Sequence, residues 1–395
     1  MPTPVGSATM PESTGSRRPV QDDEGDLMSK AAVLTGIGQP LEMREDVEVD
    51  APHAGELNIH MAASGVCHSD LSMQNGTMMA ATPIVLGHEG AGVVEEVGPD
   101  VKGFEPGDHV VISWVPQCGH CFFCTRNQGY LCENSNAALA TGGLLDGTTR
   151  MTSQGAPLYQ MAASGTFGET TIIPASGAVK IPKDFDLKLG ALIGCGVLTG
   201  AGAALNTADI APGDTVAVVG CGGVGLNVIQ GARIAGAKEI IAVDMAETKL
   251  QMAKEFGATA TVNASQGDPV SQVMTMTAER GADVAFEVIG LQQTIDQVIT
   301  MTRRGGQAIL VGVPKMDAMV NLPAFFGVVL QAKTIKGCWY GSSNVQKDVP
   351  RLIELYKSGQ LKLDELVSRT IHLDQVNEAF EAMQGGEVAR SVIVY

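Results

Sequence analysis

One stretch of the chain, residues 215–225 with the sequence TVAVVGCGGVG, decides the fold. Its apolar, β-branched first half is typical of a buried strand, and the second half reads G-x-G-x-x-G. Apolar residues then recur at helical spacing over residues 226–235, Gly236 stops that run, and residues 239–243 give a second apolar run that ends at Asp244. The pattern predicts a strand–helix–strand unit of an α/β protein, and further short apolar runs at 284–288, 307–313 and 334–338 predict more strands.

The glycine-rich turn predicts a dinucleotide site. Its glycines allow a tight turn and let a pyrophosphate approach the helix N-terminus. They are Gly220, Gly222, Gly223 and Gly225. Asp244 follows at the distance where an acidic residue binds the ribose hydroxyls, and its carboxylate would repel a 2′-phosphate. We therefore expect NAD rather than NADP, with Lys249 as a second ribose contact; a glycine-rich turn that binds no nucleotide is the alternative.

Four cysteines lie close together at metal-ligand spacing. They are Cys118, Cys121, Cys124 and Cys132, spaced C-x2-C-x2-C-x7-C. Four thiolates complete the tetrahedral shell of a zinc ion, which would then staple a loop that has few apolar residues of its own. We predict a structural zinc; an iron–sulfur cluster and four unrelated thiols are the alternatives.

A second set of possible ligands is spread along the chain. Cys67 and His88 lie about twenty residues apart, and Cys195 follows much later in a Gly/Ala-rich segment. Two thiolates and an imidazole suit a catalytic zinc, which keeps one position open. Asp70 is the candidate carboxylate that orients the histidine, and Glu89 is a candidate for a transient metal ligand. Each residue alone is more typical of an ordinary core position, and only the combination of all of them favours a catalytic zinc site.

Composition excludes several classes of function. The chain has 395 residues, 45% hydrophobic and 17% charged, with 48 glycines and a net charge of −17. This is a globular composition, and the negative charge argues against nucleic-acid and membrane-surface partners. Residues 190–205 predict a buried segment rather than a membrane span. Residues 1–27 lack the apolar core of a signal peptide, so we expect a cytoplasmic protein with a flexible tail, or a start-site artefact ahead of Met28.

Taken together, these motifs resemble the zinc-containing medium-chain alcohol dehydrogenases. The resemblance runs from about Lys30 to Tyr395 and includes GVCHSD, LGHEGAGVVEEVG, the four-cysteine lobe, IGCGVLTG, GCGGVG, FEVIG and LVGVP. It implies a GroES-like β-barrel catalytic domain and a doubly wound Rossmann sheet with parallel strands. The implied limits are 28–196 and 340–395 for the catalytic domain, 114–135 for its zinc lobe and 197–339 for the NAD-binding domain. It also implies a homodimer or homotetramer.

The resemblance assigns roles residue by residue. Cys67, His88 and Cys195 match the catalytic zinc ligands, and the four lobe cysteines match the structural zinc, which gives one zinc of each kind per subunit. Ser69 matches the hydroxyl that touches the substrate oxygen, and Trp114 matches an aromatic pocket wall. The remaining matches are to the cofactor site: His68 and Arg390 at the pyrophosphate, Thr199 and Val224 at the nicotinamide, and Val313 as a further cofactor-binding residue.

Some positions depart from the family pattern. Ser72 stands where many relatives have the histidine that ends the proton relay, so we expect solvent or His68 to take the proton. Met78 and Ser135/Asn136 stand near the positions where thiol-adduct formaldehyde dehydrogenases grip their substrate. With Trp114 and Met161, Met78 predicts an apolar pocket for a hydrophobic or aromatic primary alcohol.

We therefore predict a zinc- and NAD-dependent alcohol dehydrogenase whose partners are small alcohols and aldehydes. A nicotinoprotein, which keeps NAD bound and reduces an external acceptor, is the first alternative. A thiol-adduct formaldehyde dehydrogenase is less favoured because of Met78 and Ser135/Asn136. A non-catalytic zinc- or nucleotide-binding protein is less favoured because Cys67, His88 and Cys195 are all present, and a zinc-free quinone reductase is less favoured because both cysteine sets are present.

Overall fold

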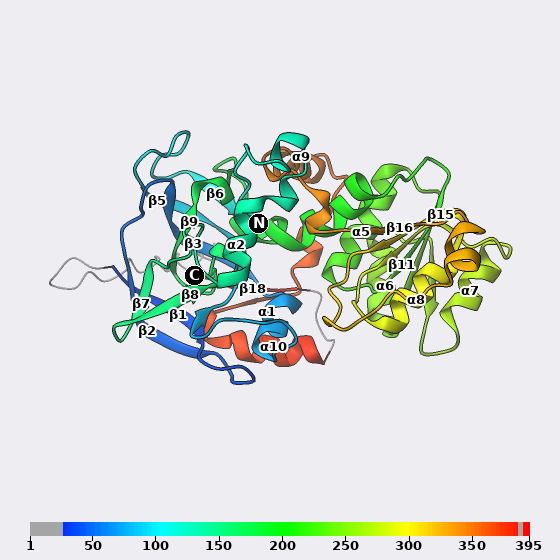
Figure 1. Ribbon diagram of the computed structural model, residues 1–395, viewed down its shortest axis with the longest axis horizontal. Coiled ribbons are helices and arrows are strands. Elements are labelled where there is room, and N and C mark those ends of the chain that lie inside the picture. Colours follow the sequence, from blue (N-terminus) through cyan, green and yellow to red (C-terminus); the bar gives the residue numbers. More distant parts are fainter. Residues whose placement is uncertain (1–26, 386–389) are drawn as a thin grey trace, which may run out of the picture.

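Two parts lie side by side along the long axis of the molecule (Figure 1). The structure is a computed structural model that describes residues 27–385 and 390–395. One part combines a β-barrel with a mixed sheet drawn from both ends of the chain, and the other holds a parallel sheet drawn from the middle. The predicted N-terminal tail lies outside the described residues except for Leu27, where strand β1 begins.

The barrel is closed by five strands in the order β1-β2-β7-β8-β4. Their bounds are Leu27–Leu34, Glu42–Val49, Met151–Ser153, Ala156–Gln160 and Ile84–Val85. Buried residues such as Leu34, Val47 and Leu158 form the apolar cluster that these strands enclose. The GroES-like barrel implied by the resemblance is therefore confirmed.

A seven-stranded mixed sheet packs beside the barrel and brings the two ends of the chain together. Its order is β10-β6-β5-β3-β18-β17, with β9 also paired to β3. The bounds are Ala178–Lys180, His109–Ile112, Glu89–Val97, Glu56–Gly65, Ser391–Val394, Arg369–Ile371 and, for β9, Thr170–Pro174. Gly65 at the end of β3 lies opposite both Glu89 and Val392. This register places the residue after β3, the start of β5 and the residue before β18 at one edge of the sheet.

The parallel sheet has six strands in the order β13-β12-β11-β14-β15-β16. Because β11 is the first of the six along the chain, this is the doubly wound order 3-2-1-4-5-6, which the resemblance implied. The bounds, in chain order from β11, are Thr215–Val219, Glu239–Asp244, Ala260–Asn263, Ala282–Glu287, Thr302–Leu310 and Thr334–Gly337. The strands predicted from the apolar runs are thus present, with ends displaced by up to five residues.

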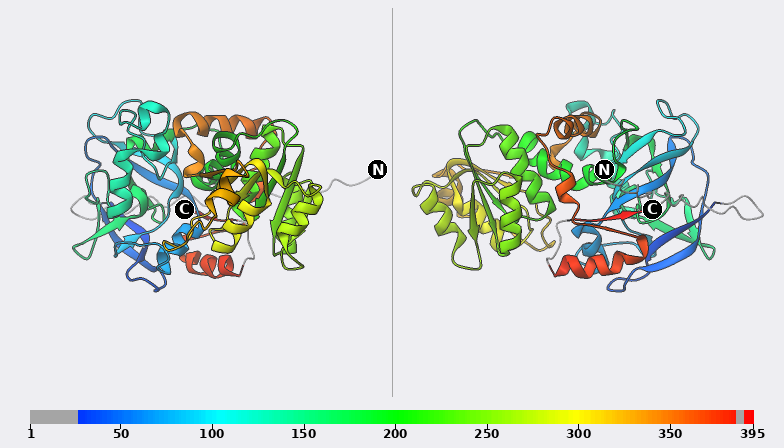
Figure 2. Two further views of the ribbon diagram at one scale, coloured as in Figure 1. Left: turned by 45° about the vertical axis from the view of Figure 1, so that its right-hand side comes forward. Right: turned by 180° about the vertical axis from the view of Figure 1, so that it is seen from behind.

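Helices cover both faces of the parallel sheet (Figure 2). They are α5 (Gly223–Ala235), α6 (Glu247–Phe256), α7 (Pro269–Met276) and α8 (Gln292–Met301). Alternate residues of β11 point to opposite faces: Val216 and Val218 pack in the same cluster as α5 and α6, and Ala217 and Val219 pack with α7 and α8. Burial on both faces explains why the strand reads as a continuous apolar run.

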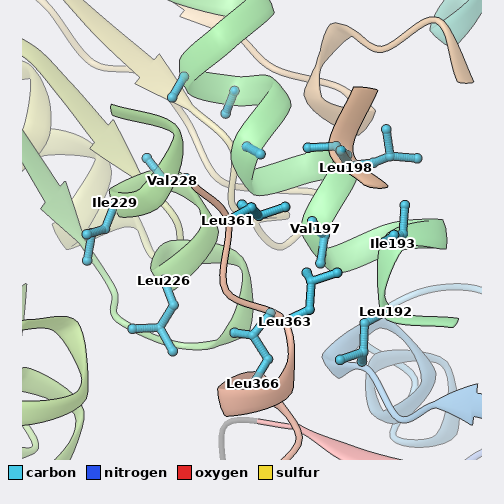
Figure 3. Packing of buried hydrophobic residues seen from close by; sticks show 14 of the residues in the cluster. Leu192, Ile193, Val197, Leu198, Leu226, Val228, Ile229, Leu361, Leu363 and Leu366 are labelled. Carbon is cyan, nitrogen blue, oxygen red and sulfur yellow. The ribbon is translucent and has the colours of Figure 1, made fainter. Parts of the chain in front are cut away.

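A long buried helical segment joins the two parts of the molecule. It comprises α3 (Leu187–Leu192), the π-helix η5 (Ile193–Val197), α4 (Leu198–Gly202) and the π-helix η6 (Ala203–Thr207). The whole segment, Leu187–Thr207, is long and apolar enough to cross a membrane, yet 83% of its most apolar window is buried inside the protein. Figure 3 shows Val197 and Leu198 packed among Leu226 and Val228 of α5 and Leu361, Leu363 and Leu366 from the returning chain. Its apolarity is therefore that of a core helix, as the sequence predicted.

Four further α-helices of the described residues lie outside the parallel sheet and the long helical segment. They are α1 (His68–Gln74), α2 (Glu133–Thr141), α9 (Val345–Lys357) and α10 (Val376–Gln384). Short helical turns lie at Cys124–Arg126, Gly129–Leu131, Met161–Ala163, Ala175–Gly177, Ala324–Val329, Tyr340–Ser342, Asp364–Leu366 and Leu373–Gln375.

Candidate metal centres and cofactor cleft

The first candidate centre forms at the sheet edge beside the long helical segment. Cys67 follows β3 and caps α1, His88 precedes β5, Glu89 begins β5, and Cys195 lies in the π-helix η5. Their possible ligand atoms all lie within 4.8 Å of one another, and all four residues are buried. The fold therefore brings together three ligand candidates that are separated by up to 128 positions in the sequence.

Asp70 contacts two members of this cluster, His88 and Cys67, through its carboxylate oxygens. Its Oδ1 lies 3.0 Å from His88 Nδ1 and accepts from the Gly87 N–H at 3.2 Å, while its Oδ2 accepts from the Cys67 N–H at 2.8 Å. The carboxylate is fully buried. With Nδ1 engaged by Asp70, His88 keeps Nε2 for the centre, which is the arrangement of a carboxylate-oriented metal ligand.

The electrostatics of the cluster favour a cation. A hydrogen bond with Cys195 lowers the pKa of the Cys67 thiol well below its ordinary value, and the same bond raises the pKa of Cys195. Burial works against a charged His88, yet Asp70 and Cys67 raise its pKa well above the ordinary value. Two sulfurs and an imidazole nitrogen in a buried pocket are the donor set of a catalytic zinc, so the residues fit that ion.

Glu89 is the fourth member of the cluster. Among the described residues neither carboxylate oxygen has a hydrogen-bond partner, although the Arg390 guanidinium lies 3.4 Å from Oε1. Burial raises the pKa of Glu89 to about 8 against the attraction of Arg390. A Cβ at Gly65 would stand 2.2 Å from Oε2, so only glycine leaves room for this carboxylate. A buried carboxylate beside the thiols, without a hydrogen bond among the described residues, agrees with a site for a cation.

The four-cysteine lobe forms the second candidate centre. The four sulfurs lie within 4.8 Å of one another. Backbone N–H groups of the lobe point at them: Cys118 N lies 3.4 Å from Cys132 Sγ, and Cys121 N lies 3.4 Å from Cys118 Sγ. Backbone hydrogen bonds lower the pKa of Cys121 to about 6, while burial raises that of Cys124 to about 12. Four converging thiols with N–H donors to sulfur form a closed tetrahedral set that fits zinc.

The glycine-rich turn joins β11 to α5. Gly220 has φ +100°, a conformation that favours glycine, and a Cβ at Gly225 would lie 1.8 Å from the Gly220 carbonyl oxygen. A Cβ at Gly222 would meet nothing within 4 Å, so the backbone there borders open space. Asp244 ties the turn to β12, because its Oδ2 accepts from the Cys221 N–H at 2.9 Å and its Oδ1 from the Ala246 N–H at 3.0 Å. This geometry suits a dinucleotide whose phosphates approach the start of α5.

Three basic side chains lie near this turn. Arg390 touches the glycine turn, since a Cβ at Gly223 would lie 2.4 Å from its Nε, and its Nη1 donates to the Val66 carbonyl at 3.3 Å. Desolvation by burial lowers the pKa of His68; the Cys67 charge raises it, and the charges of Arg390 and Lys249 lower it. The three residues singled out in the sequence for phosphate and ribose contacts therefore lie close enough to feel one another's charge.

Aromatic side chains pack next to His88 of the first candidate centre. The Trp114 ring lies edge-on to the His88 ring, with centroids 6.3 Å apart. Trp339 and Tyr340, which follow β16, pack on Trp114 with centroid distances of 5.1 and 4.5 Å. Sequence reasoning missed both residues; the signal available was a pair of large aromatics directly after the last strand, in a chain with 4% aromatic residues.

The other predicted site residues occupy varied surroundings. Ser69 Oγ lies 3.9 Å from Cys67 Sγ. Thr199 and Val224 are half-buried where α4 meets α5, and Val313 is exposed in the loop after β15. Met78 packs at the margin of the barrel cluster together with Trp114, whereas Met161 is 3% exposed inside that cluster. The pocket role of Met161 therefore stays a prediction.

Comparisons with known proteins agree with this arrangement. The alcohol dehydrogenase GroES-like domain family matches residues 53–183, and the zinc-binding dehydrogenase family matches residues 223–358. A relative from Amycolatopsis methanolica, named NDMA-dependent alcohol dehydrogenase, is 38% identical over 371 residues, which cover 93% of this chain and 99% of the relative.

Solved structures give the same result. The alcohol dehydrogenase zinc-binding domain protein from Burkholderia ambifaria is similar with TM-score 0.89 and 34% identity, covering 93% of this chain and 99% of that one. Benzyl alcohol dehydrogenase from Acinetobacter calcoaceticus follows with TM-score 0.87, 30% identity and the same coverage. This chain belongs to the family of zinc-containing medium-chain alcohol dehydrogenases, enzymes that use zinc and a nicotinamide cofactor.

Proposed function

We propose that the enzyme interconverts hydrophobic, preferably aromatic, primary alcohols and their aldehydes with NAD as the hydride carrier. The observation that carries this proposal is the convergence of Cys67, His88, Glu89 and Cys195 within 4.8 Å, next to the Arg390 side chain that also contacts the glycine-rich turn. The Trp114 ring against His88 favours a flat apolar group near the reacting carbon.

The residues around the centre have distinct tasks. When bound, zinc polarises an alcohol oxygen as a Lewis acid, and the nicotinamide accepts a hydride. Cys67, His88 and Cys195 would hold the ion, and Asp70 fixes the orientation of the His88 ring. Ser69, whose Oγ lies 3.9 Å from Cys67 Sγ, is the proposed first acceptor of the alcohol proton and would pass its own proton on. Since Ser72 offers no imidazole, His68 or solvent receives the proton next.

Glu89 has a further role in this proposal. Its carboxylate, without hydrogen-bond partners among the described residues, is positioned to approach the centre when a water or product leaves. The Arg390 charge at 3.4 Å holds it back at other times. This pairing would keep a buried carboxylate available without leaving it uncompensated.

The proposal for NAD over NADP rests on Asp244. Its carboxylate is half-buried at the end of β12, the position at which an acidic residue binds the ribose hydroxyls of NAD, and its charge would repel a 2′-phosphate there. We also propose two zinc ions per subunit, one at Cys67, His88 and Cys195 and one in the four-cysteine lobe, which metal analysis of the purified protein would count.

We propose a homodimer formed through the edge strand β16. Among the described strands β16 pairs only with β15, so its outer edge is free to pair with a second copy. The segment just before it exposes large apolar side chains, namely Met319, Val320, Phe325, Phe326, Val329 and Leu330. Such a patch beside an open edge is typical of an interface. Light scattering of wild type and Phe326→Asp would show a dimer and a monomer, respectively; a dimeric variant would refute this interface.

The domain limits and the compartment are proposals as well. The catalytic domain is taken as residues 28–196 and 340–395, with the zinc lobe at 114–135, and the cofactor domain as residues 197–339. All eight cysteines are free of disulfides, which favours a reducing compartment such as the cytoplasm.

A nicotinoprotein reaction is the second candidate, because the Amycolatopsis methanolica relative is named NDMA-dependent. In that case NAD stays bound and an external acceptor takes the electrons. The test is the absorbance of reduced nicotinamide after benzyl alcohol is added to purified protein, with and without free NAD⁺. Sustained turnover that needs added NAD⁺ supports a dissociable cofactor. One equivalent of reduced cofactor without added NAD⁺ supports a nicotinoprotein, and no signal in either case refutes the proposed reaction.

A further inference from the structure

The helical turn that carries Cys195 lacks the hydrogen-bond pattern of an α-helix. It is a π-helix, residues Ile193–Val197, in which the Leu198 N–H donates to the Ile193 carbonyl. In an α-helix that N–H would serve the carbonyl of Gly194, four residues earlier. A π-helical turn therefore needs support from outside the helix, and such turns are frequent at functional sites.

Tyr340 supplies that support. Its hydroxyl donates to the Gly194 carbonyl and also lies 3.3 Å from Ser113 Oγ. The side chain is buried, with 2% of its surface exposed. Burial raises the pKa of Tyr340 well above its ordinary value, so the hydroxyl keeps its proton and remains a donor.

The segment that presents Tyr340 is held in a costly backbone conformation. Tyr340 and Ser342 have φ +52° and +48°, a region that side chains with a Cβ rarely adopt, and Gly341 between them has φ +65°. The surroundings enforce this turn. Asn206 Nδ2 donates to the Gly341 carbonyl at 3.3 Å, and Gln117 Nε2 from the start of the four-cysteine lobe donates to the Ser343 carbonyl at 3.0 Å.

The helix also has no freedom to move toward the sheet. A Cβ at Gly194 would lie 2.6 Å from the Ile112 carbonyl oxygen in β6, so the turn already packs against that strand. Tyr340 presses on the Trp114 ring, which in turn stands edge-on to His88. The position of Cys195 is thus bounded by β6 on one side and by Tyr340 on the other.

We propose that Tyr340 is a positioning residue for Cys195: its hydroxyl fixes the π-helical turn so that the Cys195 sulfur faces Cys67 and His88. The residue comes from the chain that leaves the cofactor-binding sheet, so it links that sheet to the metal centre. This inference rests on the proposed function of Cys195 as a zinc ligand.

The test compares Tyr340→Phe with wild type in the zinc-loaded enzyme. Phenylalanine keeps the ring against Trp114 and removes only the donor to Gly194. Tyr356→Phe is the matched control, because its hydroxyl donates to Asp364 Oδ2 at 2.7 Å at the surface, away from the centre. The readouts are the rate of Cys195 alkylation by iodoacetamide, followed on its own peptide by mass spectrometry, together with kcat and the KM for NAD.

We expect Cys195 of Tyr340→Phe to be alkylated about tenfold faster than in wild type, with the lobe cysteines unchanged. We expect kcat to fall ~10- to 100-fold, since displacement of a reacting group by ~1 Å costs up to that much, and the KM for NAD to stay the same. Tyr356→Phe should match wild type in every readout.

Two results would overturn the inference. The first is wild-type kcat and wild-type Cys195 alkylation in Tyr340→Phe. The second is an equal rise in alkylation at Cys195 and at the lobe cysteines, which would indicate general loosening. A separate arm tests the underlying proposal: if wild-type Cys195 reacts at one rate with and without zinc, Cys195 is not a ligand and the proposed centre fails with it.

Discussion

Asp70→Asn is the perturbation that bears most directly on how this site is organised. The aspartate accepts from His88 Nδ1 and Gly87 N–H through one oxygen and from Cys67 N–H through the other. Asparagine has nearly the same shape but only one acceptor oxygen, so its NH2 group must face at least one N–H donor. The variant therefore loses the charge and at least one hydrogen bond without creating a cavity.

The magnitude follows from these contacts. A hydrogen bond to a charged group contributes ~1.5–3 kcal/mol, and Asp70 is fully buried, so solvent does not replace the lost partner. Loss of a carboxylate behind a metal-binding histidine lowers metal affinity or activity by ~10- to 100-fold. That range corresponds to ~1.4–2.7 kcal/mol, which agrees with the loss of one such bond.

The assay is zinc content after dialysis against graded chelator concentrations, measured together with kcat. We expect Asp70→Asn to lose one zinc per subunit at ~10- to 100-fold lower chelator concentration than wild type, and kcat to fall in parallel. Asp268→Asn is the matched control, because Asp268 also accepts from two backbone N–H groups, at the surface start of α7. Wild-type zinc retention and kcat in Asp70→Asn would refute the role given to this carboxylate.

Three further predictions concern other parts of the molecule. Asp244→Ala should raise the KM for NAD about tenfold and relax discrimination against NADP, because it removes a charged ribose acceptor; an unchanged NAD/NADP ratio would refute this role. Cys121→Ser should lower the zinc content by one ion per subunit and should lower Tm. The kcat of the folded variant should change less than about threefold, because the lobe takes no part in the reaction. A larger loss of kcat with wild-type Tm would contradict a structural role for the lobe. Against desolvation, hydrogen bonds from Arg150 and Thr148 lower the pKa of Asp146 from 3.8 to about 2. The stability from this carboxylate is therefore present above pH 3.8 and is lost as pH falls toward 2, so the Tm difference between wild type and Asp146→Asn should be constant from pH 7 to about 5 and shrink below pH 4; a difference that grows on acidification would contradict the sign.

Much of the fold was predictable because its signals are local. The fold signals lie close together in the sequence, since strand 215–219, its glycine turn and Asp244 fall within 30 residues. Each signal reflects a local requirement. A strand buried on both faces favours β-branched residues, a turn with positive φ favours glycine, and a carboxylate follows at the end of the next strand. The lobe cysteines are also local, so their spacing alone predicted the cluster. Strand ends were less predictable because β15 begins in a polar stretch, residues 302–306, whose pairing depends on the neighbouring strand.

The residue types suggested Cys67, His88 and Cys195 as ligands of the first metal centre, and the resemblance strengthened that prediction, but no local pattern showed that the three residues meet. Cys67, His88 and Cys195 converge because β3 pairs with β5 and because the helical segment packs across both, and no local pattern encodes that register. Tyr340 and Trp339 were missed for the same reason. Their contacts with Gly194 and Trp114 arise from a turn with two non-glycine residues at positive φ, a conformation that propensity argues against and only tertiary packing enforces.

The most direct test of the central claim is turnover by Cys67→Ser, measured as reduced nicotinamide formed from benzyl alcohol, with circular dichroism and zinc content on the same sample. The account predicts a folded protein that retains the lobe zinc, lacks the second zinc and shows no turnover above background. A folded Cys67→Ser enzyme with wild-type turnover would contradict the claim that Cys67, His88 and Cys195 form the catalytic centre.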